Sequence, residues 1–250
     1  MITTEPLTNA QVRRYEDEGF LVVPDILTGE EVDEFVAYEA RPLPAGWREV
    51  LLHHTDDPVW RKFATHPKVV AMAAQLTRGT PRIVQSMYLE KAPLGEGEKG
   101  GTGTALHQDL HYLPCEPDTL MACWIAMSDT DAENGGLAVV PRSHKKGLHK
   151  THRTANVDDH DSWEFEYDMR GPDGKEWKEK MYSFEIDGLD PNAVVRLEVP
   201  KGSAVFFTGK TIHGSYGNRS RDRYRRALAV HYVTEGTWVY RADVQNTMAT

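Results

Sequence analysis

The feature that most constrains the fold is a change of hydrophobic rhythm near Pro81. Before this point, apolar residues recur at the spacing of amphipathic helices. After it, the chain breaks into short β-like runs separated by turns. Helices followed by many short strands favour an antiparallel β-sandwich or barrel that is braced by N-terminal helices. We therefore expect a mainly β fold of this kind.

The first 80 residues predict one short strand and three helical stretches. A helix capped at Thr8 and Asn9 runs to about Glu18, where Gly19 stops it. Thr28 and Glu31 form a capping box at the start of a second helix. The short strand is Phe20–Val23, and the third helical stretch runs from about Pro58 to Leu76.

Seven further strands are expected after Pro81, each a short apolar or alternating run bounded by turn residues. They are Arg82–Lys91, Ala105–Leu110, Thr119–Met127, Leu137–Val140, Val194–Glu198, Ser203–Phe207 and Arg225–Thr234.

Length and composition indicate a single globular domain over residues 1–250. The formal net charge of −9 argues against nucleic acid or an anionic membrane as the main partner, since either needs a basic face. The two cysteines, Cys115 and Cys123, are too few for a disulfide framework. With neither a signal peptide nor an apolar stretch of membrane-spanning length, we expect a soluble cytoplasmic protein. The sequence does not indicate an oligomeric state.

One long insertion, residues 156–192, carries twelve acidic residues against four basic ones. It also contains six aromatic residues, which a disordered stretch would have little reason to carry. Long insertions in compact domains are commonly active-site lids. We therefore predict a lid, and its acidity favours a neutral or cationic substrate over a polyanionic one.

The first chemical signal is the sequence His107-Gln108-Asp109 at the end of an expected strand. Residues i and i+2 of a strand point to the same face, so the imidazole and the carboxylate can reach one metal ion. A distant second histidine would complete the facial triad of two His and one carboxylate found in non-haem iron(II) oxygenases. Such a pair alone is a weak signal, because it is more often made of ordinary surface polar residues.

A second block of residues supplies the missing groups. His213 and Ser215 follow the strand that ends at Phe207, and Arg225 opens the last predicted strand. Strand alternation places Arg225 on one face with Ala227 and Ala229, so that a charged head lies beside small residues that leave room for a ligand. A guanidinium there suits the distal carboxylate of a dicarboxylic acid. The alternative is that the arginines between 219 and 226 form one solvated basic turn.

Together these segments resemble the phytanoyl-CoA dioxygenase family of Fe(II)/2-oxoglutarate oxygenases. The resemblance covers roughly residues 10–235 and is dense in three segments. These are DEGFLVVPDILTGEEV, LHQDLHYLPCEPDTLMACWIAMSDTDAENGGLAVVPRSHKKG and HGSYGNRSRDRYRRALAVHY.

The resemblance implies a double-stranded β-helix (jelly-roll, cupin-like) fold and the cofactors Fe(II), 2-oxoglutarate and O₂. It implies His107, Asp109 and His213 as the iron ligands. The cosubstrate-binding positions that it implies are Arg225, with Arg226 as a minor alternative, Ser215, Trp124 and Met87. A further basic contact with the cosubstrate, present upstream in some members, has no counterpart in the pattern.

Several other polar residues have two interpretations. His111 either faces the site or is an ordinary satisfied histidine, while His53 and His54 lie at the surface or at a pocket rim. The basic residues of the 142–153 loop either hold an anionic substrate, such as a coenzyme A thioester, or form a solvated loop. They are Arg142, Lys145, Lys146, Lys150 and Arg153.

The expected function is hydroxylation of a small molecule, coupled to conversion of 2-oxoglutarate into succinate and CO₂. Because Asp109 is present, the position where a halogenating relative would bind chloride is filled. Two alternatives stay open at this point. One is a cupin-type metalloenzyme that does not use 2-oxoglutarate, and the other is a non-catalytic metal or small-molecule binding domain.

Overall fold

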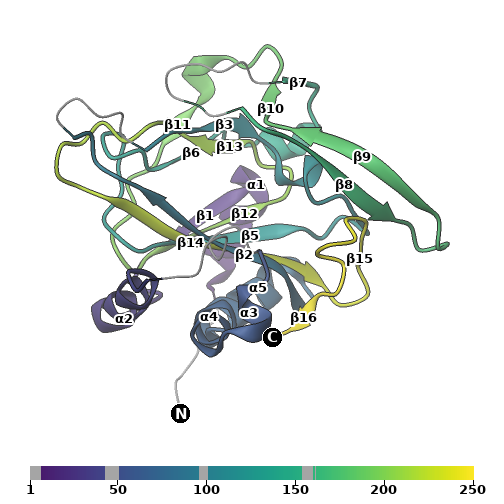
Figure 1. The fold of residues 1–250 in the computed structure, drawn as a ribbon, viewed down its shortest axis with the longest axis horizontal. Helices are drawn as coiled ribbons and strands as arrows, with labels where there is room; N and C mark the ends of the chain where they lie inside the picture. Colours follow the sequence, from purple (N-terminus) through teal and green to yellow (C-terminus); the bar gives the residue numbers. More distant parts are fainter. Residues whose placement is uncertain (1–6, 43–50, 96–100, 154–159, 161) are drawn as a thin grey trace.

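Two antiparallel sheets, packed face to face, form the body of the protein in the computed structural model, which describes residues 7–42, 51–95, 101–153, 160 and 162–250 (Figure 1). The larger sheet has the order β1 (Phe20–Val23), β12 (Ala204–Thr208), β5 (Met121–Ala126), β14 (Arg225–Thr234), β2 (Pro81–Lys91) and β16 (Met248–Ala249). The smaller sheet has the order β11 (Val195–Arg196), β6 (Leu137–Val139), β13 (His213–Ser215) and β3 (Thr104–His107). The predicted double-stranded β-helix is confirmed.

Strand alternation divides the larger sheet into two apolar faces. In β5, Cys123 and Ile125 belong to the cluster shared with the helices, whereas Trp124 and Ala126 pack against Val139 of the smaller sheet. A strand buried on both faces reads as a continuous apolar run, as β5 does. The interior between the sheets is therefore closed on one side by small and aromatic residues.

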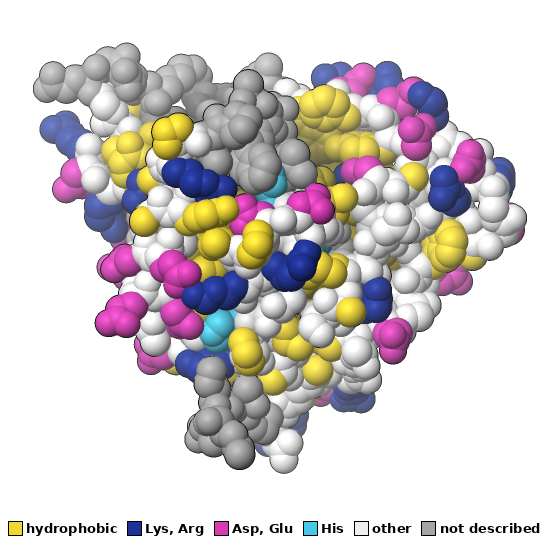
Figure 2. Space-filling view, turned by 60° about the horizontal axis from the view of Figure 1, so that its bottom comes forward, with side chains coloured by type: hydrophobic (Ala, Val, Ile, Leu, Met, Phe, Trp, Pro, Cys, Tyr) yellow, Lys and Arg dark blue, Asp and Glu magenta, His cyan; other side chains and the backbone are white. Residues whose placement is uncertain are grey.

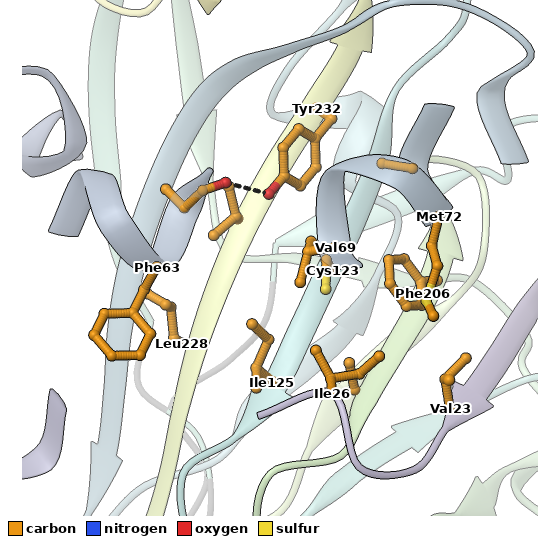
Figure 3. Close-up of a cluster of buried hydrophobic side chains, with 14 of the residues drawn as sticks. Val23, Ile26, Phe63, Val69, Met72, Cys123, Ile125, Phe206, Leu228 and Tyr232 are labelled. Carbon is orange, nitrogen blue, oxygen red and sulfur yellow. Dashed lines mark hydrogen bonds between the residues drawn. The ribbon is translucent and has the colours of Figure 1, made fainter. Parts of the chain in front are cut away.

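The helices α2 (Gly29–Glu39), α3 (His53–Asp56), α4 (Pro58–Ala64) and α5 (Pro67–Thr77) cover the outer face of the larger sheet (Figure 1). Helix α1 (Asn9–Glu18) lies beside the edge strand β1. Figure 3 shows Phe63, Val69 and Met72 packed over Ile125 and Leu228 of the sheet. Both predicted caps are present, at Thr8 and at Thr28. This layer holds the sheet without entering the interior between the sheets.

The prediction of one helical stretch from Pro58 to Leu76 was wrong in one respect, because α4 and α5 are separate helices. Pro67 lacks the N–H that a continuous helix needs, and it disfavours the helical conformation at His66. Accordingly, His66 has non-helical backbone angles and precedes α5 as its N-cap residue.

The predicted strand Ala105–Leu110 is also only partly correct. Strand β3 ends at His107, and a 3₁₀ turn, η2 (Asp109–His111), follows Gln108. The other predicted strands agree with the structure to within two residues at each end, and Arg225–Thr234 is reproduced in full. The short strands β4 (Cys115–Glu116) and β15 (Trp238–Val239) pair with each other.

The expected lid contains a β-hairpin of β8 (Glu164–Arg170) and β9 (Glu176–Tyr182), which projects beside the two sheets (Figure 1). A second small pair joins β7 (Thr151–Arg153) to β10 (Phe184–Ile186). Two more 3₁₀ turns, η3 (Ser143–Lys146) and η4 (Pro191–Ala193), lie in the connections. Residues 156–159 and 161 of the expected lid lie outside the described residues.

The surface charges and the two cysteines fit what the composition indicates. Acidic and basic side chains are interspersed over the face shown in Figure 2. Cys115 and Cys123 are both free thiols, the second fully buried. Within the described ranges, no helix is long and apolar enough to cross a bilayer.

Candidate active site

Three predicted metal ligands converge between the two sheets. The donor atoms of His107, Asp109 and His213 all lie within 4.8 Å of one another, and all three residues are buried. Asp109 Oδ1 is 3.5 Å from Nε2 of each histidine. This closeness follows from register, because His213 of β13 lies directly opposite His107 of β3. The arrangement can hold one metal ion with two imidazoles and one carboxylate.

Backbone carbonyls fix the tautomer of both histidines. His107 Nδ1 lies 2.7 Å from the carbonyl of Ala105, and His213 Nδ1 lies 3.0 Å from that of Thr211. A carbonyl only accepts, so Nδ1 carries the proton and Nε2 is left with a lone pair. Burial lowers the pKa of His213 to about 4, which keeps this ring neutral near pH 7. Neutral imidazoles with Nε2 facing one point are what a divalent metal requires.

Local packing positions the loops that carry the ligands. Gln108 is buried, and its Nε2 donates to the carbonyls of Gly147 and Lys210. Its extended backbone turns Asp109 toward His107, although Asp109 itself belongs to the 3₁₀ turn rather than to the strand. Gln108 is therefore a packing residue that faces away from the metal-binding group.

A third histidine contacts the carboxylate from the opposite side. His231 Nε2 lies 3.1 Å from Asp109 Oδ2, and its Nδ1 lies 3.4 Å from Gln85 Nε2. Burial alone would raise the pKa of Asp109, but the neighbouring His213 and His231 and the hydrogen bonds hold it well below its usual value. Asp109 is therefore an oriented, ionised carboxylate with Oδ1 directed toward the two imidazoles.

Two buried basic residues lie opposite each other at another part of the interior. Arg225 of β14 pairs in register with Lys91 of β2, and both are only 4% exposed. Burial lowers the pKa of Arg225 to about 10, while burial and then Arg225 lower that of Lys91 to about 6. Like charges opposite each other in a sheet are destabilising, and buried charges are normally paired. No described carboxylate pairs with either one, so this place is suited to an anionic ligand.

The polar atoms around these cations are partly satisfied. Lys91 Nζ donates to Ser215 Oγ at 2.8 Å and to the carbonyl of Tyr216 at 2.5 Å. Arg225 Nη1 donates to the carbonyl of Leu89 at 3.1 Å, while its Nε is buried without a hydrogen-bond partner. An unsatisfied buried donor costs about 1–3 kcal/mol, more when it is charged. A carboxylate of a bound ligand would satisfy it.

Register also separates Arg225 from its neighbour Arg226. Arg226 lies opposite Glu90 on the other face of the sheet, and its Nε donates to that carboxylate at 2.8 Å. Arg225 faces the interior, and Arg226 does not line the cavity there. Of the two arginines, the structure therefore favours Arg225 as the partner of an anionic ligand.

A cavity of about 310 Å³ joins the metal-binding group to Arg225 and Ser215. Met87 and Trp124 line it, from positions that flank Ala229 in one row across three strands. The volume is in the range of small-molecule sites. Every predicted site residue thus lines one cavity between the sheets.

The comparisons with known proteins agree with this geometry. The family model described as phytanoyl-CoA dioxygenase (PhyH) matches residues 45–227, well over half of the chain. This chain belongs to the phytanoyl-CoA dioxygenase family. Enzymes of the family are non-haem oxygenases that use Fe(II), 2-oxoglutarate and O₂, so the predicted class of enzyme and its cofactors are confirmed.

Among curated proteins, mouse peroxisomal phytanoyl-CoA dioxygenase is 30% identical over 252 residues, which cover 90% of this chain and 68% of the mouse protein. Among solved structures, the α-ketoglutarate-dependent carbocyclase SnoK is 25% identical, with a TM-score of 0.67 over 96% of this chain and 88% of SnoK. The epimerase SnoN, in complex with Fe³⁺, α-ketoglutarate and nogalamycin RO, is 20% identical. Its TM-score is also 0.67, over 94% of this chain and 86% of SnoN.

Sequence reasoning missed two polar residues of this phytanoyl-CoA dioxygenase family site. Lys91 ends a correctly predicted strand and has the same parity as Met87, so strand alternation could have placed it in the interior. His231 has the same strand parity as Arg225, because the β-bulge in β14 comes only after His231. Strand alternation could therefore also have placed His231 in the interior. Neither residue has a local motif that marks it.

The remaining histidines lie outside the cavity lining of this family member. His111 Nε2 is 3.1 Å from the carbonyl of His149, which fits the satisfied-histidine interpretation. The expectation of a surface or rim position for His53 and His54 was wrong, since both are buried. His54 Nδ1 lies 2.8 Å from Ser86 Oγ.

The basic loop has structural contacts. Arg142 pairs with Glu18, Lys145 pairs with Asp17, and Arg153 pairs with Glu164. Because three of the five basic side chains are already matched by acidic ones, the loop fits the solvated interpretation better than a site for an anionic substrate.

Proposed function

We propose that this member of the family hydroxylates a small organic molecule at a site where His107, Asp109 and His213 hold Fe(II). The observation that carries the proposal is the convergence, in one cavity, of three metal-ligating side chains with the buried Arg225, which no described carboxylate pairs and which lies opposite Lys91 in the sheet. In the overall reaction, 2-oxoglutarate, O₂ and a C–H group give succinate, CO₂ and an alcohol, which balances atoms and electrons.

The residues present fit the metal on the chemistry of the donor set. Two imidazoles and one carboxylate are the donor set with which non-haem oxygenases hold iron(II) and still leave room for cosubstrate and O₂. When bound, iron supplies the oxidation chemistry with O₂ that these side chains cannot perform. His231 would hold Asp109 in its orientation through Oδ2.

For the cosubstrate, we propose that Arg225 and Lys91 bind the distal carboxylate of 2-oxoglutarate, with Ser215 beside them. The buried Arg225 Nε without a partner supports this assignment, because a carboxylate would accept from it. Met87 and Trp124 would pack against the carbon chain and exclude water from the charged end.

The two alternative functions have less support. A metalloenzyme that does not use 2-oxoglutarate would leave the buried Arg225 without a counter-charge. A non-catalytic binding domain would have no need of a complete set of three ligands with fixed tautomers.

The test is succinate formation by the purified protein with Fe(II), ascorbate and 2-oxoglutarate, across a panel of small molecules. We expect succinate to form, Asp109→Ala to abolish it, and Arg225→Ala to raise the KM for 2-oxoglutarate at least 100-fold. Arg226→Ala is the matched control and should leave that KM within about twofold. Succinate formation that persists in Asp109→Ala would contradict the metal assignment. An unchanged KM in Arg225→Ala would contradict the cosubstrate assignment.

We also propose a reducing, cytoplasmic compartment for the protein. The free thiols Cys115 and Cys123 support this proposal, because thiols stay reduced in such compartments. Thiol titration of the protein isolated from its native host under trapping conditions tests it. Two reduced thiols per chain are expected, and oxidised ones would contradict it.

A further inference from the structure

The hairpin of β8 and β9 has two chemically different faces. On one face, acidic side chains of β8 pair with lysines of β9, as Glu166 does with Lys178 at 3.0 Å and Glu164 with Lys180 at 2.9 Å. The other face of β8 carries Phe165, Tyr167 and Met169. Three acidic side chains of β8, Glu164, Glu166 and Asp168, thus pair with lysines on the face turned away from these rings.

The aromatic face forms a wall of the cavity. Trp163, immediately before β8, and Tyr167 both line the cavity together with Tyr112. Ring contacts continue from a metal ligand outward, from His107 to Tyr112 at 5.2 Å and from Tyr112 to Trp163 at 5.4 Å between centroids. The chain of rings continues to Phe165, which is 60% exposed. Apolar, planar surface therefore extends from the metal ligands to the outside.

The charges that face this wall disfavour a cation. Among the described residues that line the cavity, the charged ones are Asp109, Arg225 and Arg241. Asp109 faces the metal ligands, and Arg225 lies at the cosubstrate end. Arg241 is placed 4.0 Å over the ring of Tyr167, where it already uses the aromatic face that could hold a cationic ligand.

The wall does not attract an anion strongly either. Arg241 Nε donates to Asp243 Oδ1 at 3.0 Å, so its charge is matched by a carboxylate. Aromatic side chains contribute most by burying apolar area and by offset or edge contacts with other rings. The complementary ligand is neutral, apolar and flat.

We infer that the substrate is a neutral, largely apolar molecule with a planar ring, packed against the wall that Tyr112, Trp163 and Tyr167 form beside the metal site. This inference rests on the proposed function and names its substrate class. It removes the cationic alternative that the acidic composition of residues 156–192 favoured, because the described acids of β8 do not line the cavity. The oxidised C–H group would lie on the part of this molecule nearest His107.

The experiment measures binding of three probes of one shape and different charge, 2-naphthol, 2-naphthoate and 2-naphthylmethylammonium. The protein is loaded with Fe(II) and 2-oxoglutarate without O₂, and affinities are measured by calorimetry at pH 7. We expect 2-naphthol to bind at least tenfold more tightly than the ammonium probe, and more tightly than the carboxylate. Equal or tighter binding of the cation would overturn the inference.

Variants of the wall connect this preference to the named residues. Trp163→Ala should weaken 2-naphthol binding at least tenfold, and Trp163→Phe should restore most of it. Trp177→Ala, on the same hairpin but outside the cavity lining, is the matched control and should have little effect. Trp163→Glu should reverse the order of the neutral and cationic probes, a result that loss of the hairpin fold would not produce. An unchanged order in that variant contradicts the inference.

Binding of 2-oxoglutarate, measured in the same preparations, separates the two proposals. If 2-oxoglutarate does not bind, the proposed function fails. If it binds normally but the naphthol probe shows no preference, only the substrate class is wrong.

Discussion

His231 Nε2 lies 3.1 Å from Asp109 Oδ2, on the side of the carboxylate opposite the two histidines that approach Oδ1. The contact fixes which oxygen of Asp109 faces the metal-binding point. We therefore expect His231 to act as a positioning residue. Loss of a hydrogen-bond partner of a metal ligand typically lowers metal affinity or activity 10- to 100-fold.

Replacing His231 by Leu should therefore weaken Fe(II) binding by about 10- to 100-fold, and His231→Gln, which keeps a donor, should recover part of the loss. Anaerobic calorimetry with Fe(II) provides the measurement. His111→Gln is a suitable control, because that side chain contacts the carbonyl of His149 and does not line the cavity. Equal affinities in His231→Leu and the unmodified protein would exclude the positioning role.

The pair of Lys91 and Arg225 predicts that binding of 2-oxoglutarate takes up a proton. Burial and then Arg225 lower the pKa of Lys91 to about 6, so the lysine is mostly neutral at pH 7.5 without a ligand. A bound carboxylate favours the protonated form and raises that pKa. Calorimetry in phosphate and in Tris should give different apparent enthalpies. Lys91→Met should remove the difference and weaken binding at least tenfold, whereas a buffer-independent enthalpy in the unmodified protein would contradict this prediction.

The same lysine predicts how the stability of the ligand-free protein depends on pH. Between about pH 6 and its usual value near 10.5, Lys91 binds a proton in the unfolded chain but not in the folded one. Stability should therefore rise with pH across this window, and be lowest at and below pH 6, with a slope from this group of about 1.4 kcal/mol per pH unit.

Lys91→Met should stabilise the metal-free protein near pH 7 by at least about 2 kcal/mol and should remove this slope. Urea unfolding at pH 6.5, 7.5 and 8.5 measures both effects. A variant that is less stable than the unmodified protein at all three pH values would show that the buried Lys91 does not lower the stability of the folded protein.

A further prediction concerns the helix layer rather than the site. Tyr232 is fully buried, and its hydroxyl donates to the carbonyl of Ala64 at 2.7 Å (Figure 3). Tyr232→Phe removes this donor and leaves the carbonyl without its partner, which should cost about 1–2 kcal/mol of unfolding free energy. Affinity for 2-oxoglutarate should not change, because Tyr232 belongs to the helix-facing apolar cluster. Tyr240→Phe, which removes a solvent-exposed hydrogen bond to Glu116, should change stability by less than about 0.5 kcal/mol, and an equal loss in both would argue against the buried hydrogen bond.

Local pattern was sufficient for much of the fold. The two capping boxes, the strand from Arg225 to Thr234 and the alternation of apolar residues depend on neighbours within a few positions, so they could be read in order along the chain. For the candidate metal ligands, local pattern suggested only His107 and Asp109, which are two positions apart, and the family resemblance added His213.

Only the tertiary structure shows which side chains from distant strands face each other, because this depends on the pairing register. Lys91 and Arg225 are 134 positions apart in sequence, yet they are direct partners across β2 and β14. The same register places Arg226 opposite Glu90 on the other face, and a separate pairing places acids of β8 opposite lysines of β9. A one-residue shift in any of these pairings would exchange the two faces. The sequence alone determined the chemistry of the metal ligands, and the pairing of strands decided which charges meet inside.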